Sequence, residues 1–261
     1  MVENKDVRDS NGYGKYKLVD SVIINGRKCF NVEFLSTGYR KVVQQKEFDS
    51  GSIKDPLYPS IKGVGYCSDP NTPRSYKENG KTVRTPSYEV WLGILKRCYT
   101  KQSTSYSNYG GRGVVICEEW KDFSIFHEWF TKHYVDGCVL DKDILSNNYR
   151  GIIYSPDTCR FVPPIINGFF TNSRNARGLY PVGVCKKVNK NGSFRYIAQV
   201  GDLVSRQMVL GRFLTMHEAF CAYKEVREKQ AKLLAEEYFK LGKLTEDVYI
   251  RLIKWEAVPY P

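Results

Sequence analysis

The sequence lacks the features of membrane and secreted proteins. No run of about 18 consecutive apolar residues occurs anywhere in the 261 residues, so we expect no transmembrane segment. The first residues, MVENKDVRDS, are polar and of mixed charge, so they do not resemble a signal peptide. These absences predict a protein that has no membrane partner and is located in the cytoplasm.

Cysteine pairs with zinc-ribbon spacing are absent as well. The chain has 8 cysteines, and no two of them stand in a C-x-x-C arrangement. Without an export signal we expect a reducing compartment, and therefore free thiols rather than disulfides. Most of these thiols should be buried, where they behave as small apolar side chains.

Basic residues outnumber acidic ones. Lys and Arg total 40 and Asp and Glu total 28, which gives a net charge of +12. The excess is spread along the chain and is densest between residues 181 and 240, and no segment is a solid basic tail. A folded body with a basic surface predicts a polyanionic partner such as nucleic acid. The alternative is a soluble basic protein without such a partner.

The N-terminal third is expected to be β-rich. Alternating apolar residues predict strands over 15–24, 28–35 and 39–45, and Asn25-Gly26 is a strong hairpin turn signal between the first two. We therefore predict a small antiparallel β domain over residues 1–66. The following Gly, Pro, Ser and Lys-rich stretch is expected to be irregular, which makes 67–85 a linker.

Helical spacing of apolar residues begins at Pro86 and predicts the first helix of a second region. A short strand is expected at 114–117, and a helix with an aromatic core stripe at 122–134. His127 lies beside that stripe, where a structural role is the more common one. Residues 138–175 then predict a strand, a polar loop, a short strand and a helix.

The C-terminal region predicts three antiparallel strands followed by a long helix. The strands are expected at 182–188, 193–200 and 203–210, the last one closed by Gly211. Thr215 and Glu218 form a capping box that opens the helix. A short final helix is expected over 245–255, and the chain as a whole is predicted to be α+β.

One face of this three-stranded sheet would be covered by the helix and the other left free. The predicted DNA-binding side chains are Lys187, Arg195, Gln199 and Gln207, with Lys186 and Arg206 beside them. Lys and Arg bind phosphate or guanine, Gln pairs with adenine, and a β-ribbon fits the major groove, which is about 12 Å wide. The alternative is an ordinary exposed polar sheet face.

The segments GVCKKV, FRYIAQV and RQMVLGRF, followed by TMHEAFCAYKEV, resemble the AP2 DNA-binding domain. The resemblance covers about 60 residues and implies a sheet that lies in the major groove of double-stranded DNA. The matching contact positions are Cys185, Lys187, Gln199, Gly201, Gln207 and Val209. Only Lys187, Gln199 and Gln207 keep a polar side chain, so the resemblance supports the fold more than a particular base sequence.

The preceding region resembles the HNH, or ββα-metal, nucleases of phage that carry an AP2 domain behind the nuclease. The resemblance rests on Tyr88-x-x-Trp91, YGGRGVVICEEW, LDKDIL, YSPDTCRFVP and Asn167. It implies a homing-type endonuclease acting in a host bacterial cell, with an HNH-like module over 86–178 and an AP2-like domain with C-terminal helices over 179–261.

The resemblance also assigns the site residues. Asp141 and Asn167 match the ligands of Mg²⁺ or another divalent metal, for which oxygen donors are suited. Lys142 stands where the general-base His belongs, Thr158 stands where a loop Asn belongs, and Asp143 is a substitute ligand or base. An ordinary Lys is protonated at neutral pH, so it could contact phosphate but not activate water.

Three functions follow from these residues. The first is a double-stranded DNA-binding protein whose nuclease site no longer cleaves. The second is an active metal-dependent nicking or homing endonuclease. The third is a protein-interaction factor that acts on a host protein, kept open by the apolar or small residues at Cys185, Gly201 and Val209.

Overall fold

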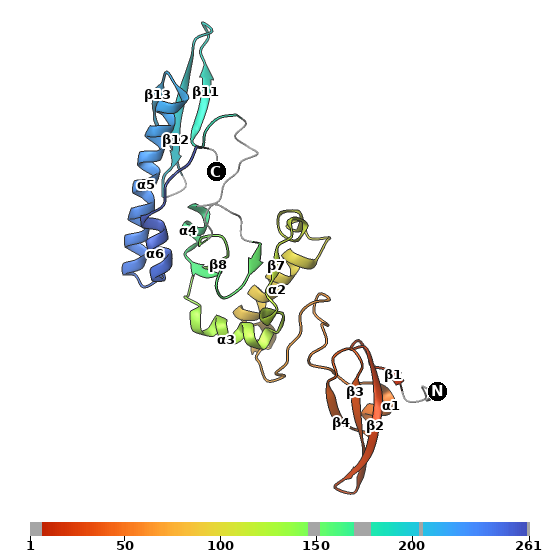
Figure 1. Cartoon of the computed structure of the whole chain (residues 1–261). Helices are drawn as coiled ribbons and strands as arrows, with labels where there is room; N and C mark the ends of the chain where they lie inside the picture. The colour runs from red at the N-terminus through yellow and green to blue at the C-terminus, as the bar shows by residue number, and fades with distance from the viewer. Residues whose placement is uncertain (1–6, 146–151, 170–178, 204–205, 260–261) are drawn as a thin grey trace. The chain divides into compact units, whose positions relative to one another are not determined.

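The computed structural model describes residues 7–145, 152–169, 179–203 and 206–259, and its elements are mixed α and β, as expected (Figure 1). The chain divides into two units by its internal contacts. Residues 1–132 with 152–155 belong to the first unit, and residues 133–151 with 156–261 belong to the second.

A four-stranded antiparallel meander begins the first unit and confirms the three expected strands. Its strands, in spatial and chain order, are β1 (Val7–Asp9), β2 (Lys15–Ile24), β3 (Arg27–Phe34) and β4 (Arg40–Gln44). Asn25 and Gly26 turn between β2 and β3 with φ of 50° and 73°, the left-handed conformation of a tight hairpin turn. The short helix α1 (Gln45–Ser50) adds Phe48 to a buried aromatic cluster with Tyr16, Phe30 and Phe34.

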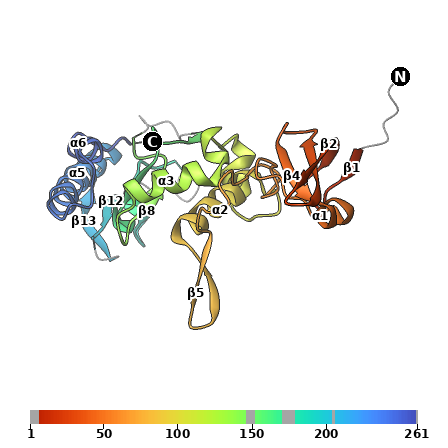
Figure 2. The ribbon, with the colours of Figure 1, turned by 90° about the horizontal axis from the view of Figure 1, so that it is seen from below.

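Residues 75–84, expected to be irregular, form a hairpin. Strands β5 (Ser75–Glu78) and β6 (Lys81–Arg84) pair antiparallel, and Asn79 and Gly80 join them with φ of 49° and 76°. The expectation was wrong here because the strands bury no apolar face, so no apolar alternation accompanies the Asn-Gly turn signal. In Figure 2 the hairpin extends away from α2 (Pro86–Tyr99), the helix into which it leads.

Two helices form the aromatic core of the first unit. Helix α2 begins where the Thr85 hydroxyl caps the Tyr88 amide, and it packs with α3 (Phe123–His133) through Trp91, Phe123 and Phe126, all fully buried. The expected strand at 114–117 shortens to β7 (Val115–Ile116), which pairs in parallel with β9 (Ile153–Tyr154). Three 3₁₀ turns complete this part: η1 (Tyr106–Asn108), η2 (Gly110–Arg112) and η3 (Glu119–Lys121).

The second unit contains the expected three-stranded antiparallel sheet and long helix. The sheet is β11 (Val184–Val188), β12 (Phe194–Gly201) and β13 (Gln207–Phe213), and α5 (Met216–Lys240) lies along one of its faces (Figure 1). The capping box is confirmed, because Thr215 accepts the Glu218 amide at 3.2 Å and Glu218 accepts the Thr215 amide at 3.1 Å. Val184, Ala198 and Val200 pack against Phe220 and Tyr223 of α5.

The remaining elements of the second unit pack on the far end of α5. Strands β8 (Val139–Asp141) and β10 (Arg160–Val162) pair antiparallel, and α4 (Pro164–Phe169) follows β10 directly. The final helix is α6 (Glu246–Ile253). One core joins them, formed by Ile144, Val162, Ile166, Phe169, Ala231, Leu234, Ala235, Leu244, Val248 and Leu252.

No helix in the described part of the chain is both long and apolar enough to span a membrane.

Candidate nucleic-acid interface

The face of the β11–β13 sheet turned away from α5 is here called the outer face. Antiparallel partners share a face and neighbours along a strand alternate, so the pairing identifies its members. Its cross-strand sets are Cys185 with Ile197 and Arg212, Lys187 with Arg195, Gln199 with Val209, and Gly201 with Gln207. The predicted residues Lys187, Arg195, Gln199 and Gln207 are therefore brought together.

Three cations lie close to one another on the outer face. Lys187 is directly opposite Arg195, and Arg212 is opposite Ile197, two residues further along β12. Opposed side chains have Cβ atoms about 5 Å apart and diagonal ones about 7–8 Å. All three cations are exposed, and within the described ranges no carboxylate lies within ion-pair distance of any of them.

The three strands contain no acidic residue at all. Like charges placed opposite one another destabilise a sheet, and here nothing on the strands offsets that repulsion. The outer face is thus suited to a partner that supplies negative charge.

Two predicted contacts do not lie on the outer face. Lys186 pairs with Tyr196 on the side of α5, where its ammonium lies 4.0 Å from the centre of the Phe194 ring. Arg206 lies in the turn before β13, where its amide donates to the Asp202 carboxylate at 2.6 Å. Lys186 is therefore on the opposite side of the sheet from the other four predicted residues, and Arg206 is outside the sheet.

Arg212 is the outer-face residue that sequence reasoning missed. The third strand was expected to end before Gly211, but β13 runs from Gln207 to Phe213. Ala198 pairs with Gly211 while Gln199 pairs with Val209, so Leu210 is an extra residue that forms a bulge. The bulge shifts the alternation by one position and turns Arg212 outward. Gly211 inside a strand is a signal for such an irregularity.

Asp141 and its neighbours form a tight polar turn at the end of β8. The Oδ1 atom of Asp141 accepts the backbone amides of Asp143 and Ile144, each at 2.7 Å. Burial raises the pKa of Asp141 above its ordinary value, and the two amide hydrogen bonds act in the opposite direction. One carboxylate oxygen is therefore committed to the turn, and Oδ2 is left for other contacts.

Lys142, at the position of the expected general base, is buried with 6% of its surface exposed. Its ammonium donates to Oδ1 of Asp143 at 2.7 Å. One of the three N–H donors of the ammonium is therefore directed at Asp143. Asp143, the other expected base, is occupied by the same ion pair.

Asp141 and Asn167, the expected ligands of a divalent metal, lie at the end of β8 and on α4. Asn167 is half-buried on α4, and its backbone N–H donates to the Pro163 carbonyl at 3.1 Å. Within the described ranges, no cluster of three or more His, Cys, Asp or Glu side chains has a geometry that could hold a metal ion. The oxygen of Asp141 that remains has the buried Lys142 cation as its chain neighbour, which is unfavourable for a second cation.

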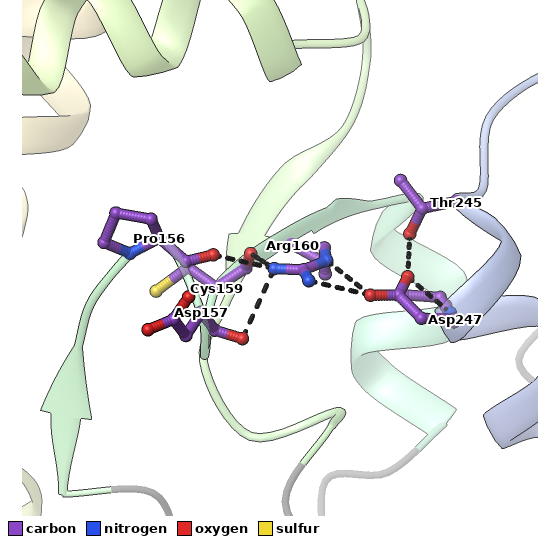
Figure 3. A network of polar contacts seen from close by, with 7 residues as sticks. Pro156, Asp157, Cys159, Arg160, Thr245 and Asp247 are labelled. Atoms are coloured by element: carbon purple, nitrogen blue, oxygen red, sulfur yellow. Dashed lines mark hydrogen bonds and ion pairs between the residues drawn. The ribbon is translucent and has the colours of Figure 1, made fainter.

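Arg160 lies opposite Asp141 in the β8–β10 pair, yet its side chain bonds to α6 (Figure 3). Its guanidinium donates to Oδ2 of Asp247 from Nε at 2.8 Å and from Nη2 at 2.7 Å. Its Nη1 donates to the carbonyls of Pro156 at 2.8 Å and Cys159 at 2.7 Å. This contact, the Arg160–Asp247 clamp, fixes the strand beside Asp141 to the last helix.

The other residues considered at the sequence level have structural surroundings. Nδ1 of His127 is 2.8 Å from the hydroxyl of the buried Ser87, so this pair links α3 to α2. Thr158 is half-buried, with its hydroxyl 3.8 Å from the Cys159 sulfur. All eight cysteines are free thiols, and six of them are buried, so the expected burial of most thiols is confirmed.

Comparison of the chain with protein-family models, with curated proteins and with solved structures finds no match.

Proposed function

We propose that the chain binds double-stranded DNA through the outer face of the β11–β13 sheet. The observation that carries the proposal is the group of three exposed cations, Lys187, Arg195 and Arg212, with no carboxylate partner among the described residues. Phosphate groups would remove the repulsion between these cations, and their binding would release counterions from the DNA.

The shape of the sheet supports the same partner. Three strands spaced about 4.8 Å apart make a ribbon close in width to the major groove, which is about 12 Å wide. Gln199 and Gln207 lie further along the same outer face and can bond to base edges. Val209 is 60% exposed there and offers an apolar contact of the kind that thymine methyl groups accept.

The part of the chain that resembles a ββα nuclease is proposed to position DNA rather than to cleave it. The paired strands β8 and β10 followed by α4 are compatible with that resemblance. The ion pair between Lys142 and Asp143 favours the non-cleaving alternative, because it occupies both groups expected to serve as a base. Cleavage dependent on Mg²⁺ or another divalent metal is the competing proposal.

Fluorescence anisotropy with a labelled duplex of mixed sequence tests the binding. The test variant combines Lys187→Ala, Arg195→Ala and Arg212→Ala. The matched control combines Lys232→Ala, Lys240→Ala and Lys254→Ala, which removes the same charge from exposed residues of the second unit outside the sheet. Each lost phosphate contact should reduce the slope of log K against log salt by about 0.9, so the test variant should lose about 2.7.

Equal slopes for the test and control variants would contradict the proposal, and so would a wild-type protein that binds no duplex. In that second case a protein-interaction factor acting on a host protein becomes the better explanation. Plasmid incubated with the wild type and Mg²⁺ or Mn²⁺ should remain supercoiled. Nicking that disappears in Asp141→Asn, which keeps an acceptor for the turn, would establish the endonuclease instead.

A further inference from the structure

We propose that the β5–β6 hairpin, residues 75–84, is a second DNA-binding element that contacts phosphates of a DNA duplex. This inference rests on the proposed function, but the residues that carry it belong to the other unit. We refer to residues 75–84 as the ribbon.

The ribbon has no core of its own and covers none. Every residue in it is exposed except Val83, which is half-buried, and Tyr76 is 47% exposed. A two-stranded hairpin alone is marginally stable in water, because it buries little apolar surface. The ribbon therefore contributes little buried surface to the stability of the fold. Binding to a partner molecule is the better explanation for its presence.

The charge of the ribbon points to a polyanion. Arg74, Lys77, Lys81 and Arg84 are basic, and Glu78 is the one acidic residue between positions 74 and 84. Arg84 pairs with Glu89 at 3.1 Å, whereas Lys77 and Lys81 have no carboxylate within ion-pair distance among the described residues. The Lys77 ammonium donates to the Thr82 hydroxyl at 2.7 Å, which orients it and leaves two donors available.

The register places these cations on both sides of the ribbon. Lys77 shares a face with its partner Thr82, and Lys81 shares the other face with its partner Glu78. A ribbon that enters a groove meets a phosphate strand on each side, so cations on both faces suit a groove. Four residue pairs extend about 13 Å, which is longer than the depth of a major groove, about 8.5 Å. The ribbon is therefore long enough to reach the floor of the groove.

The base of the ribbon is joined to the start of α2 by hydrogen bonds. The Thr85 amide donates to the Arg74 carbonyl at 3.0 Å, which closes the base of the hairpin. The Thr85 hydroxyl donates to the Pro73 carbonyl at 3.0 Å and caps the first turn of α2. The ribbon therefore leads directly into a helix whose Trp91 is buried in the aromatic core.

An acidic protein surface is the less suitable partner. Protein interfaces depend on a buried apolar or aromatic centre, and Tyr76 is the one large aromatic side chain that the ribbon offers. Its polar, cationic surface matches the composition of protein–DNA interfaces instead.

The test compares Lys77→Ala with Lys81→Ala, made together, against a control that combines Lys46→Ala and Lys101→Ala. All four lysines are exposed residues of the first unit, so test and control lose the same charge. A further variant replaces residues 76–83 by two glycines. Binding of the full chain to a labelled duplex is measured by anisotropy between about 0.05 and 0.3 M salt, where counterion release sets the slope.

We expect the ribbon variants to lose about 1.8 from the salt slope, and to weaken binding at 0.1 M salt by up to about 60-fold. The control should leave the salt slope close to that of the wild type and should change the affinity at 0.1 M salt by no more than a few-fold. In addition, Tyr76 replaced by p-azidophenylalanine should form a covalent adduct with the duplex on illumination, and the same replacement at Tyr58 should not.

Ribbon variants that bind like the control would overturn this proposal, and they would leave the proposed function intact if the outer-face variant still loses affinity. The reverse pattern, in which ribbon variants lose affinity and the outer-face variant does not, would support the ribbon and contradict the outer face. A wild type that binds no duplex overturns both.

Discussion

The Arg160–Asp247 clamp allows a quantitative test of how the second unit is held together. Arg160→Met removes two donors to Asp247 and the donors to the Pro156 and Cys159 carbonyls, so we expect a loss of about 2 kcal/mol of stability. Asp247→Asn should cost about 1 kcal/mol. The side chain of Asp247 is 42% exposed, so solvent screening reduces its attraction to Arg160.

A double-mutant cycle isolates the pair itself. With Arg160→Met and Asp247→Asn combined, the loss should fall short of the sum of the single losses by about 1 kcal/mol, the upper end for a partly exposed pair with two contacts. Hydrogen exchange of peptides from α6 is the appropriate measurement, because it reports the stability of this unit separately. A coupling energy of zero would show that the clamp forms without contributing to stability.

The coupling energy between Arg160 and Asp247 should decrease as the pH falls and disappear in acid. Burial by itself would raise the pKa of Asp247, but hydrogen bonds from Thr245 and Arg160 and the charge of Arg160 lower it below its ordinary value. A lowered folded-state pKa means that the contribution is complete above the unfolded value, about 3.9, and is lost as the pH falls through the folded value. A coupling energy that survives below that pH would refute the assignment to an ionised pair.

The remaining predictions concern Asp141 and the thiols. Asp141→Ala should destabilise the second unit by about 2–4 kcal/mol, because two backbone amides lose their acceptor, whereas Asp141→Asn keeps an acceptor and should stay within about 1 kcal/mol of the wild type. Urea denaturation followed by exchange of α4 and α5 amides measures both, and equal losses would contradict the turn geometry. A thiol reagent should label the exposed Cys221 first in the native protein, and Cys221→Ser should remove that fast phase; fast labelling of six or more thiols would contradict their burial.

The elements that local sequence determines were predicted well. The turn at Asn25-Gly26, the aromatic stripe of α3 and the capping box of Thr215 and Glu218 each depend on residues close together in the chain. The hairpin at 75–84 was missed although its Asn-Gly turn is as clear as the first. Apolar alternation was required as a second signal, and a ribbon with no buried face cannot provide it.

Features set by distant contacts could not be predicted. The bulge at Leu210 depends on how β13 pairs with β12. The alternation of side chains along a single strand cannot locate such a bulge, so Arg212 was not included in the predicted interface. The burial of Lys142 depends on packing around β8, because the local sequence gives a residue's charge and not its exposure. The parallel pairing of β7 with β9 joins residues almost forty positions apart.

The way the chain alternates between the two units has a practical consequence for dividing the protein. The backbone passes from one unit to the other after Lys132, returns for Ile152–Ser155, and leaves again at Pro156. No single protease cut or gene truncation can therefore release either unit intact. A fragment that starts at residue 179 would also expose Leu234, Val248 and Leu252, whose partners Val162 and Ile166 it lacks, and would be expected to aggregate. Fragments intended for separate expression need a circularly permuted or looped-out design.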